Sequence, residues 1–450
     1  MNLVGKQLGK SRLDARMIPW MAPLWVAFLL ATWLINEWVT RRTEWRTRFG
    51  RKLTPEAGAR HPIEFHGYAV LLAQAAMVAM YGVVLYVLQW PLWMQNWPLW
   101  LGFNADTKVG NLPLAYSLIA GMALNLTPFL VAILLSWIPK RRLLSGTRRR
   151  LIPLKAFLDF EARLSWFPLA IWLALAAFQD FTRALPHAYT DWAEPDAVQV
   201  ALSLGTMVLL ASVALPLVMV YMWRCTPLPD GELKERLHAL MKKSGVKVRK
   251  IMVWGSRDTG MLNACVFGPW ARFRYVLISP SLVDELSMEE TEAVLAHELA
   301  HARHGHLTLF FSILICLALL IGPLSMLLPA SWRASPFIAS AVILAFVAIY
   351  VRFLFGAVMR HCEREADLTS AEIVGSPIPI VVALEKLALK SGNTRNVYSW
   401  HHGSIAQRVD SVMQLSYDPD GSARVHAQIR WVRAIFIALA IVAAAAQLLF

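Results

Sequence analysis

The sequence has few charged residues. Only 16% of its 450 residues are Asp, Glu, Lys or Arg, whereas 57% are hydrophobic. Soluble domains carry about 25% charged residues. This shortage argues against a chain folded wholly in water and predicts that lipid is its main solvent.

Cysteine is also scarce. Cys225, Cys265, Cys316 and Cys362 are the four cysteines, and they show no paired spacing. This pattern argues against a disulfide framework and against a thiolate zinc site. It fits a reducing cytoplasmic face or packing within lipid.

Long apolar runs are abundant. A helix needs about 20 predominantly apolar residues to cross a bilayer core. Runs of this kind occupy residues 17–36, 68–90, 114–138, 164–178, 198–223, 307–329, 336–359 and 434–450. The fourth is short, so we expect seven to eight membrane spans. The first is not read as a cleaved signal peptide, because residues 37–42 lack a small-residue cleavage site.

The formal net charge of +14 would suit a nucleic-acid partner, but its distribution does not. Positive side chains cluster in residues 41–60, 140–163, 224–274 and 360–433. Loops 91–113 and 179–197 hold only one Lys and one Arg between them. This alternation follows the positive-inside rule. We therefore expect a bilayer and no nucleic acid as partner, with segment 224–306 facing the cytoplasm. The first span has basic residues on both sides, so its orientation stays open.

These patterns predict a mainly α fold, a polytopic helical membrane protein with a small α+β zincin-like cytoplasmic domain. We expect a helix near residues 231–245 and short strands at 251–254, 263–267 and 273–279. The predicted blocks are N-terminal membrane helices (1–223), a cytoplasmic catalytic domain (224–306), a membrane hairpin (307–360), a cytoplasmic part completing the site (361–430) and a terminal span (431–450).

The sequence His297-Glu298-Leu299-Ala300-His301 carries the clearest chemistry. Residues four apart share one face of a helix, so both imidazoles point to one spot. Glu298 lies one step round, within reach of a metal-bound water, as in the H-E-x-x-H motif of zinc peptidases. Ser287 followed by Glu290 predicts a capping box at the start of this helix.

A catalytic zinc needs a third protein ligand. The metzincin spacing fails, because its offsets hold His304 and Leu307; we interpret His304 and His306 as polar residues at the membrane boundary. Glu363 is the better candidate, since it follows the hairpin and emerges on the side of His297. Asp367, four residues on, could accept the N–H of a ligand histidine. The alternative is a solvated acidic turn.

Several separated motifs resemble one family. They are His297–His301, Glu363-x-x-Ala366-Asp367, His402-x5-Arg408-Val409, and the pairs Asn263-Ala264, Gly268-Pro269 and Val276-Leu277. Together they resemble the zinc metallopeptidase family of CAAX prenyl endopeptidases and bacterial heat-shock membrane protease X, over about residues 225–415. The extra C-terminal span, Glu365 and the pair His402-Gly403 depart from that family's pattern.

The resemblance implies that His297, His301 and Glu363 bind one Zn²⁺ per chain. It implies that Glu298 acts as general base on zinc-bound water and then protonates the leaving amine.

His402 is the candidate donor to the substrate carbonyl, with a plain surface histidine as the alternative. Arg408 is expected to brace the site by pairing with Asp367 or a neighbouring carboxylate, with a plain surface charge as the alternative. Residues 263–267 could offer an open strand edge to an extended peptide, unless they form a core strand.

The leading hypothesis is an integral membrane zinc-dependent endopeptidase. It would hydrolyse membrane-associated proteins or peptides at the cytoplasmic face, in a bacterial inner membrane. The alternative is a catalytically silent membrane scaffold or transporter with an accidental H-E-x-x-H. A protease fused to a sensor is disfavoured, because only a span follows Arg433. General quality control and maturation of a dedicated substrate both fit, and the sequence indicates no particular oligomeric state.

Overall fold

The structure is a computed structural model. It describes residues 153–185, 208–257, 260–391 and 393–449, with short stretches and single positions between 30 and 141 and at 202–206. The chain divides into two compact units, Met1–Gly146 and Thr147–Phe450. In the first, β1 (Lys108–Val109) pairs with β2 (Leu112–Pro113) in antiparallel fashion. The expected span 68–90 lies outside the described residues, and spans 17–36 and 114–138 are described only at single positions and short stretches.

A small mixed sheet forms in the second unit. Its strands are β3 (Thr226–Pro227), β4 (Lys250–Val253), β5 (Ala264–Phe267) and β6 (Tyr275–Ile278). The order is β3-β4-β6-β5, with β4 and β6 parallel and the other pairs antiparallel. The three expected strands are therefore confirmed within a few residues. All of β6 is buried, whereas β5 lies at the end of the sheet.

Short helices cover this sheet. They are α10 (Glu232–Ser244), α11 (Pro280–Glu285), α12 (Met288–Arg303), α17 (Ile378–Lys390) and α18 (Ile405–Ser416), with a 3₁₀ turn at Ala271–Phe273. The helix expected near 231–245 is α10. One apolar core joins these helices to the sheet, and it includes Leu237, Ile278, Leu295, Leu384 and Val412.

Helix α12 begins as the sequence predicts. The Ser287 hydroxyl accepts from the Glu290 N–H, and the Glu290 carboxylate accepts from the Ser287 N–H, which makes a capping box. The helix ends at His304, and Gly305 follows with φ +64°, a left-handed conformation that favours glycine. This glycine redirects the chain straight into the next, apolar helix.

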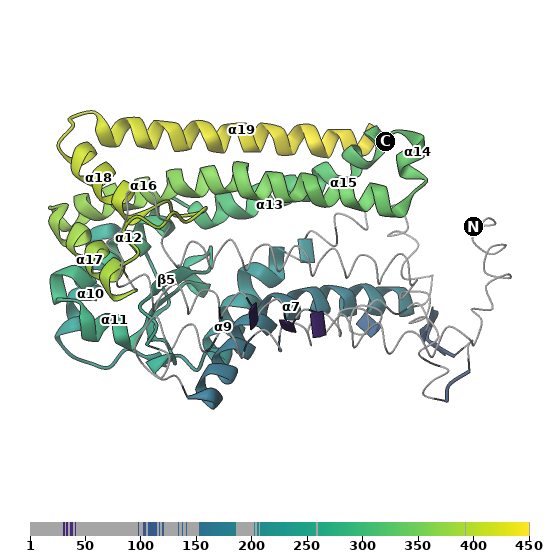
Figure 1. Ribbon diagram of the computed structural model, residues 1–450, viewed down its shortest axis with the longest axis horizontal. Coiled ribbons are helices and arrows are strands. Elements are labelled where there is room, and N and C mark those ends of the chain that lie inside the picture. Colours follow the sequence, from purple (N-terminus) through teal and green to yellow (C-terminus); the bar gives the residue numbers. More distant parts are fainter. Residues whose placement is uncertain are drawn as a thin grey trace. The chain divides into compact units, whose positions relative to one another are not determined.

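Long apolar helices form the rest of the second unit. They are α13 (His306–Leu327), α15 (Pro336–Ile349), the π-helical turn η8 (Tyr350–Phe355), α16 (Gly356–Val374) and α19 (Gly421–Leu449), with α14 (Ala330–Arg333) between α13 and α15. Helix α19 packs along α13 and α16, and the short helices gather at one end of these long ones (Figure 1). Helices α7 (Leu154–Ala184) and α9 (Leu215–Met222), the latter preceded by the π turn η5 (Leu210–Ala214), contain parts of two further expected spans.

Three helices of the described part are long and apolar enough to cross a membrane. They are His306–Leu327, Ile338–Val374 and Gly421–Ala443. The first two correspond to the expected hairpin, and the third to the expected terminal span. The full number of seven to eight spans remains a prediction.

Two expected block boundaries fall inside helices. Residue 360 lies in α16, because η8 and α16 continue the second hairpin helix to Val374, where Gly375 (φ +94°) ends it. Helix α19 begins at Gly421, so the expected boundary at residue 430 lies inside it. Hydropathy locates the apolar part of a helix, and both helices extend beyond it into polar sequence.

Candidate metal centre

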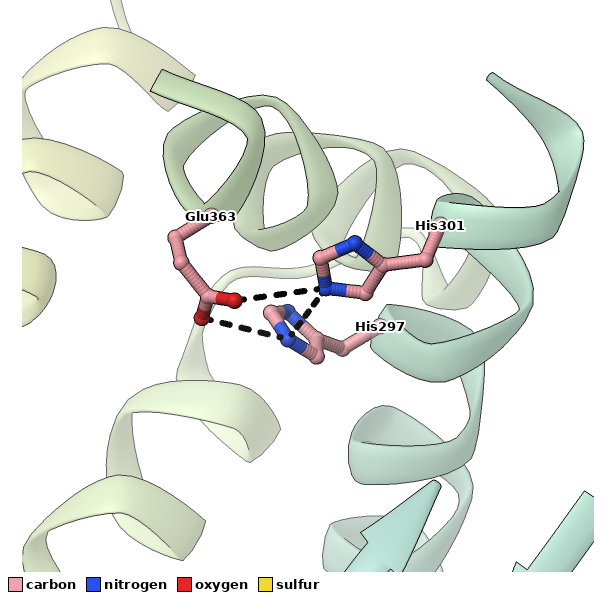
Figure 2. A group of neighbouring side chains, drawn as sticks. All are labelled: His297, His301 and Glu363. Carbon is pink, nitrogen blue, oxygen red and sulfur yellow. Dashed lines mark hydrogen bonds and ion pairs between the residues drawn. The ribbon is translucent and has the colours of Figure 1, made fainter. Parts of the chain in front are cut away.

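Two helices distant in sequence build the centre. His297 and His301 lie one turn apart on α12, and their Nε2 atoms are 3.2 Å apart. Glu363 faces them from α16 (Figure 2). Its Oε2 lies 3.6 Å from His297 Nε2, and its Oε1 lies 3.5 Å from His301 Nε2. The structure thus brings the three expected ligands into one group.

The three donors fit a zinc ion. Bonds of about 2.0–2.2 Å in a tetrahedron place ligand atoms about 3.3–3.6 Å apart, and the observed separations run from 3.2 to 3.6 Å. Glu363 Oε2 is buried and accepts no hydrogen bond from the described residues. A buried carboxylate oxygen needs a cation or a donor beside it. Arg408 Nη1 lies 3.3 Å away on one side, and the spacing of the three donors leaves room for a metal ion on the other.

Asp367 and Arg408 support His297 from behind. Asp367 Oδ1 lies 2.8 Å from His297 Nδ1, the ring nitrogen that faces away from the centre. Arg408, on α18, donates to both oxygens of Asp367 at 2.7 and 2.9 Å. Its Nη1 also lies 3.3 Å from Glu363 Oε2. Burial disfavours the charged guanidinium, but the two carboxylates outweigh it and raise the pKa of Arg408. The expected pairing of Arg408 with Asp367 is present.

Glu298 lies between the histidine pair and β5. Its Oε2 accepts from the backbone N–H of Val266 at 3.2 Å. Burial raises the pKa of Glu298 to about 7, and the charge of Glu363 adds to this effect while His297 opposes it. A carboxylate with a pKa near neutrality can both accept and return a proton.

His402 approaches from a short loop. Its Nδ1 lies 3.0 Å from Glu363 Oε1, and 46% of its side chain is exposed. A bridge between Ser399 and Gly403 closes the loop. Arg360 Nη1 donates to the carbonyl of Trp400 at 2.5 Å, which ties the loop to α16. His402 is thus held at the solvent side of the ligand group, and Arg360 positions the loop.

Four further polar side chains form a group behind His301, and this group was not expected from the sequence. His306 Nδ1 lies 2.8 Å from His301 Nδ1, and His306 Nε2 lies 2.6 Å from Glu365 Oε2. Glu365 also contacts His304 and His426.

His304 and His306 lie where α12 ends and the candidate span His306–Leu327 begins, which agrees with their interpretation as polar residues at the membrane boundary. The contacts of both with Glu365 were not expected. One feature of the sequence could have indicated this group, namely Glu365, which departs from the pattern of the family that the motifs resemble. A second carboxylate two residues after Glu363 points to another side of the helix and needs partners there.

Residues 227–427 match the model of Peptidase family M48. A CAAX prenyl protease 1 homolog of Arabidopsis thaliana is 28% identical over 194 residues, which cover 40% of this chain and 46% of that protein. A Protease HtpX homolog of Aeropyrum pernix is 30% identical over 187 residues, which cover 38% of this chain and 55% of that protein. The matched segment thus spans about half the length of these relatives.

The fold is also similar to a solved structure. Ste24p of S. mikatae superposes with a TM-score of 0.54 at 19% identity, over 87% of this chain and 98% of that one. At this identity the likeness shows a shared fold alone. The resemblance expected from the motifs is confirmed, and the segment that carries His297, His301 and Glu363 matches Peptidase family M48.

Proposed function

We propose that the protein is an integral membrane zinc-dependent endopeptidase. One observation carries this proposal most directly. Two imidazole nitrogens and a carboxylate oxygen group at metal-ligand spacing, and a carboxylate with a pKa of about 7 stands on the next residue. The match of residues 227–427 to a peptidase family supports it.

His297, His301 and Glu363 would hold the zinc. The chemistry that such an ion supplies is polarisation of the peptide carbonyl and a lowered pKa of water. Asp367 and Arg408 fix the tautomer and orientation of His297, as partners of metal-bound histidines do.

Glu298 serves as the general base. It accepts a proton from the attacking water and then passes it to the leaving amine. Its position beside Val266 places it next to the backbone of β5. His402 serves as a donor to the oxyanion, and its partial exposure leaves it free to move from Glu363 to a substrate carbonyl.

The edge of the sheet would bind the substrate. Strand β5 pairs only with β6 among the described strands, so its other side can accept an extended peptide as an added strand. That side faces Glu298, because the Val266 N–H points to its carboxylate. A peptide bound there lies beside the metal ligands.

The substrates would be membrane-associated proteins or peptides. Helix α12 passes through Gly305 directly into the apolar helix His306–Leu327, and Glu363 lies in the polar end of the apolar helix Ile338–Val374. The helix that carries His297 and His301 is therefore followed at once by a candidate span, and the helix that carries Glu363 is the end of another. The basic charge of the surrounding segments favours the cytoplasmic face of a bacterial inner membrane.

Replacing the base tests the proposal. We expect Glu298→Gln to retain one zinc at the His297 centre and to lose at least about 100-fold in peptide cleavage, the usual contribution of a general base. Glu289→Gln is the matched control, since Glu289 is an exposed residue of the same helix. Glu298→Gln protein in native membranes should also trap substrates for identification by mass spectrometry. Equal cleavage by both variants would contradict Glu298 as the general base. No cleavage by the wild type with zinc bound would favour the silent scaffold.

A further inference from the structure

A second group of metal-binding side chains lies next to the proposed catalytic centre. His304 at the end of α12, Glu365 on α16 and His426 on α19 each offer a ligand atom, and these atoms all lie within 4.8 Å of one another. Glu365 Oε1 is 2.6 Å from His426 Nδ1 and 3.5 Å from His304 Nδ1. The imidazole rings of His304 and His426 stack, with their centroids 4.9 Å apart.

The Nε2 atoms of His304 and His426 each lie within hydrogen-bond distance of a hydroxyl. His304 Nε2 lies 2.9 Å from Thr369 Oγ1, and His426 Nε2 lies 3.1 Å from Ser422 Oγ. A hydroxyl that accepts the Nε2 proton makes Nδ1 the nitrogen that can bind a metal ion, and both Nδ1 atoms face Glu365. Metal-binding histidines are usually held in this manner, with the second nitrogen bonded to a polar partner.

Glu365 is fixed and almost fully buried, with 2% of its surface exposed. Its Oε2 accepts from His306 Nε2 at 2.6 Å, which leaves Oε1 for the two other imidazoles. The separation of 2.6 Å between Oε1 and His426 Nδ1 is that of a hydrogen bond. Without a metal ion, His426 Nδ1 shares a proton with Oε1. A metal ion would replace this proton and increase the separation of the two atoms by about 1 Å, to the spacing of tetrahedral ligands.

We propose that His304, Glu365 and His426 form a second metal site, for Zn²⁺ or a similar transition-metal ion. Two imidazoles and one carboxylate suit such ions. The side chains of His304 and His426 are 21% and 23% exposed, so the rest of the chain does not close the site off. An ion there ties α19 to α12 and α16. It also connects to the first centre, because Glu365 contacts His306 and His306 contacts His301.

Metal stoichiometry tests the proposal on the full chain. The purified protein is stripped with a chelator, titrated with Zn²⁺, desalted and analysed by inductively coupled plasma mass spectrometry. We expect two zinc ions per wild-type chain, and one each in His426→Ala and His297→Ala. His238→Asn, which changes an exposed histidine of α10, should keep two. One zinc in the wild type that is retained in His426→Ala would overturn the proposal. The zinc ion that His297→Ala retains would be the one at the second site. This variant therefore tests the second site independently of the proposed peptidase activity.

A ligand exchange distinguishes metal binding from a purely structural role. His426→Cys protein loaded with Co²⁺ should show a thiolate-to-cobalt charge-transfer band in the near ultraviolet. His238→Cys serves as the control and should show none. Absence of the band in a folded, Co²⁺-loaded His426→Cys protein would contradict direct ligation by residue 426.

Discussion

Arg408 holds both carboxylate oxygens of Asp367, through Nη2 at 2.7 Å and Nε at 2.9 Å. Asp367 is fully buried, and its Oδ1 also lies 2.8 Å from His297 Nδ1. A guanidinium on α18 is thus connected, through one carboxylate on α16, to an imidazole on α12. This relationship makes the orientation of a metal ligand depend on three helices.

Removing the charge of Asp367 should weaken metal binding. We expect Asp367→Asn to lower zinc affinity about 10–100-fold, because partners of metal-bound histidines have effects of this size. The measurement is a competitive titration with a chromophoric chelator. Asp410→Asn, at an exposed position of the same helix as Arg408, is the control. Equal affinities in the two variants would contradict the supporting role of Asp367.

Removing Arg408 should destabilise the catalytic domain. Arg408→Ala leaves the buried carboxylate of Asp367 without its cation, which costs about 3–5 kcal/mol for a broken buried pair. Arg395→Ala breaks the partly exposed pair with Glu385 and should cost about 1 kcal/mol or less. Denaturant unfolding in detergent gives both values. A cost for Arg408→Ala no larger than that for Arg395→Ala would argue against the buried network.

The rate of cleavage should fall in acid. As the pH drops through the pKa of Glu298, about 7, the carboxyl gains a proton and can no longer accept one from water. A cation at the neighbouring ligands favours the carboxylate, so the acid limb should lie at or below pH 7. We expect kcat/KM to decrease about tenfold per pH unit below that point. A rate that stays level down to pH 4.5, with the protein folded and zinc bound, would contradict Glu298 as the base.

The edge of β5 offers a test of substrate binding. Asn263 is exposed just before β5, and its backbone is fixed by Ser279 through the Ser279 N–H and hydroxyl. We expect Asn263→Asp to raise KM for a peptide substrate several-fold with zinc content unchanged, since a new charge lies beside the proposed peptide strand. Asn393→Asp makes the same change in the exposed turn after α17. Unchanged cleavage by Asn263→Asp would count against the edge as the binding site.

Close packing of the His402 loop gives a fifth prediction. A Cβ at Gly356 would meet the Trp400 carbonyl oxygen at 2.9 Å and its ring at 3.0 Å. Gly356→Ala should therefore displace the loop and lower kcat while the metal is retained. Gly205→Ala, at a helical glycine with open space, is the control. Equal kcat values for the two variants would mean that the position of the loop does not matter.

The chemistry of the centre could be predicted from the sequence because its residues follow local rules. A spacing of four places His297 and His301 on one helical face, and the capping box at Ser287 marks where that helix begins. A membrane hairpin returns the chain to the side from which it entered, so Glu363 is expected on the side of His297. Each inference required only helix geometry and chain direction.

The group around Glu365 could not be predicted in this way. His426 lies 61 residues from Glu365, on a helix whose polar first turns precede the apolar stretch. Hydropathy identifies that stretch and gives no register between α19 and α16. Side-chain contacts between helices depend on how they pack, and this information is not contained in the periodicity of either helix.

The most direct test of the account is the position of zinc in crystals of the full chain. Anomalous difference diffraction at the zinc edge should give a peak about 2.0–2.2 Å from Nε2 of His297, Nε2 of His301 and a carboxylate oxygen of Glu363. No peak between these three side chains, in crystals grown with zinc, would contradict the account.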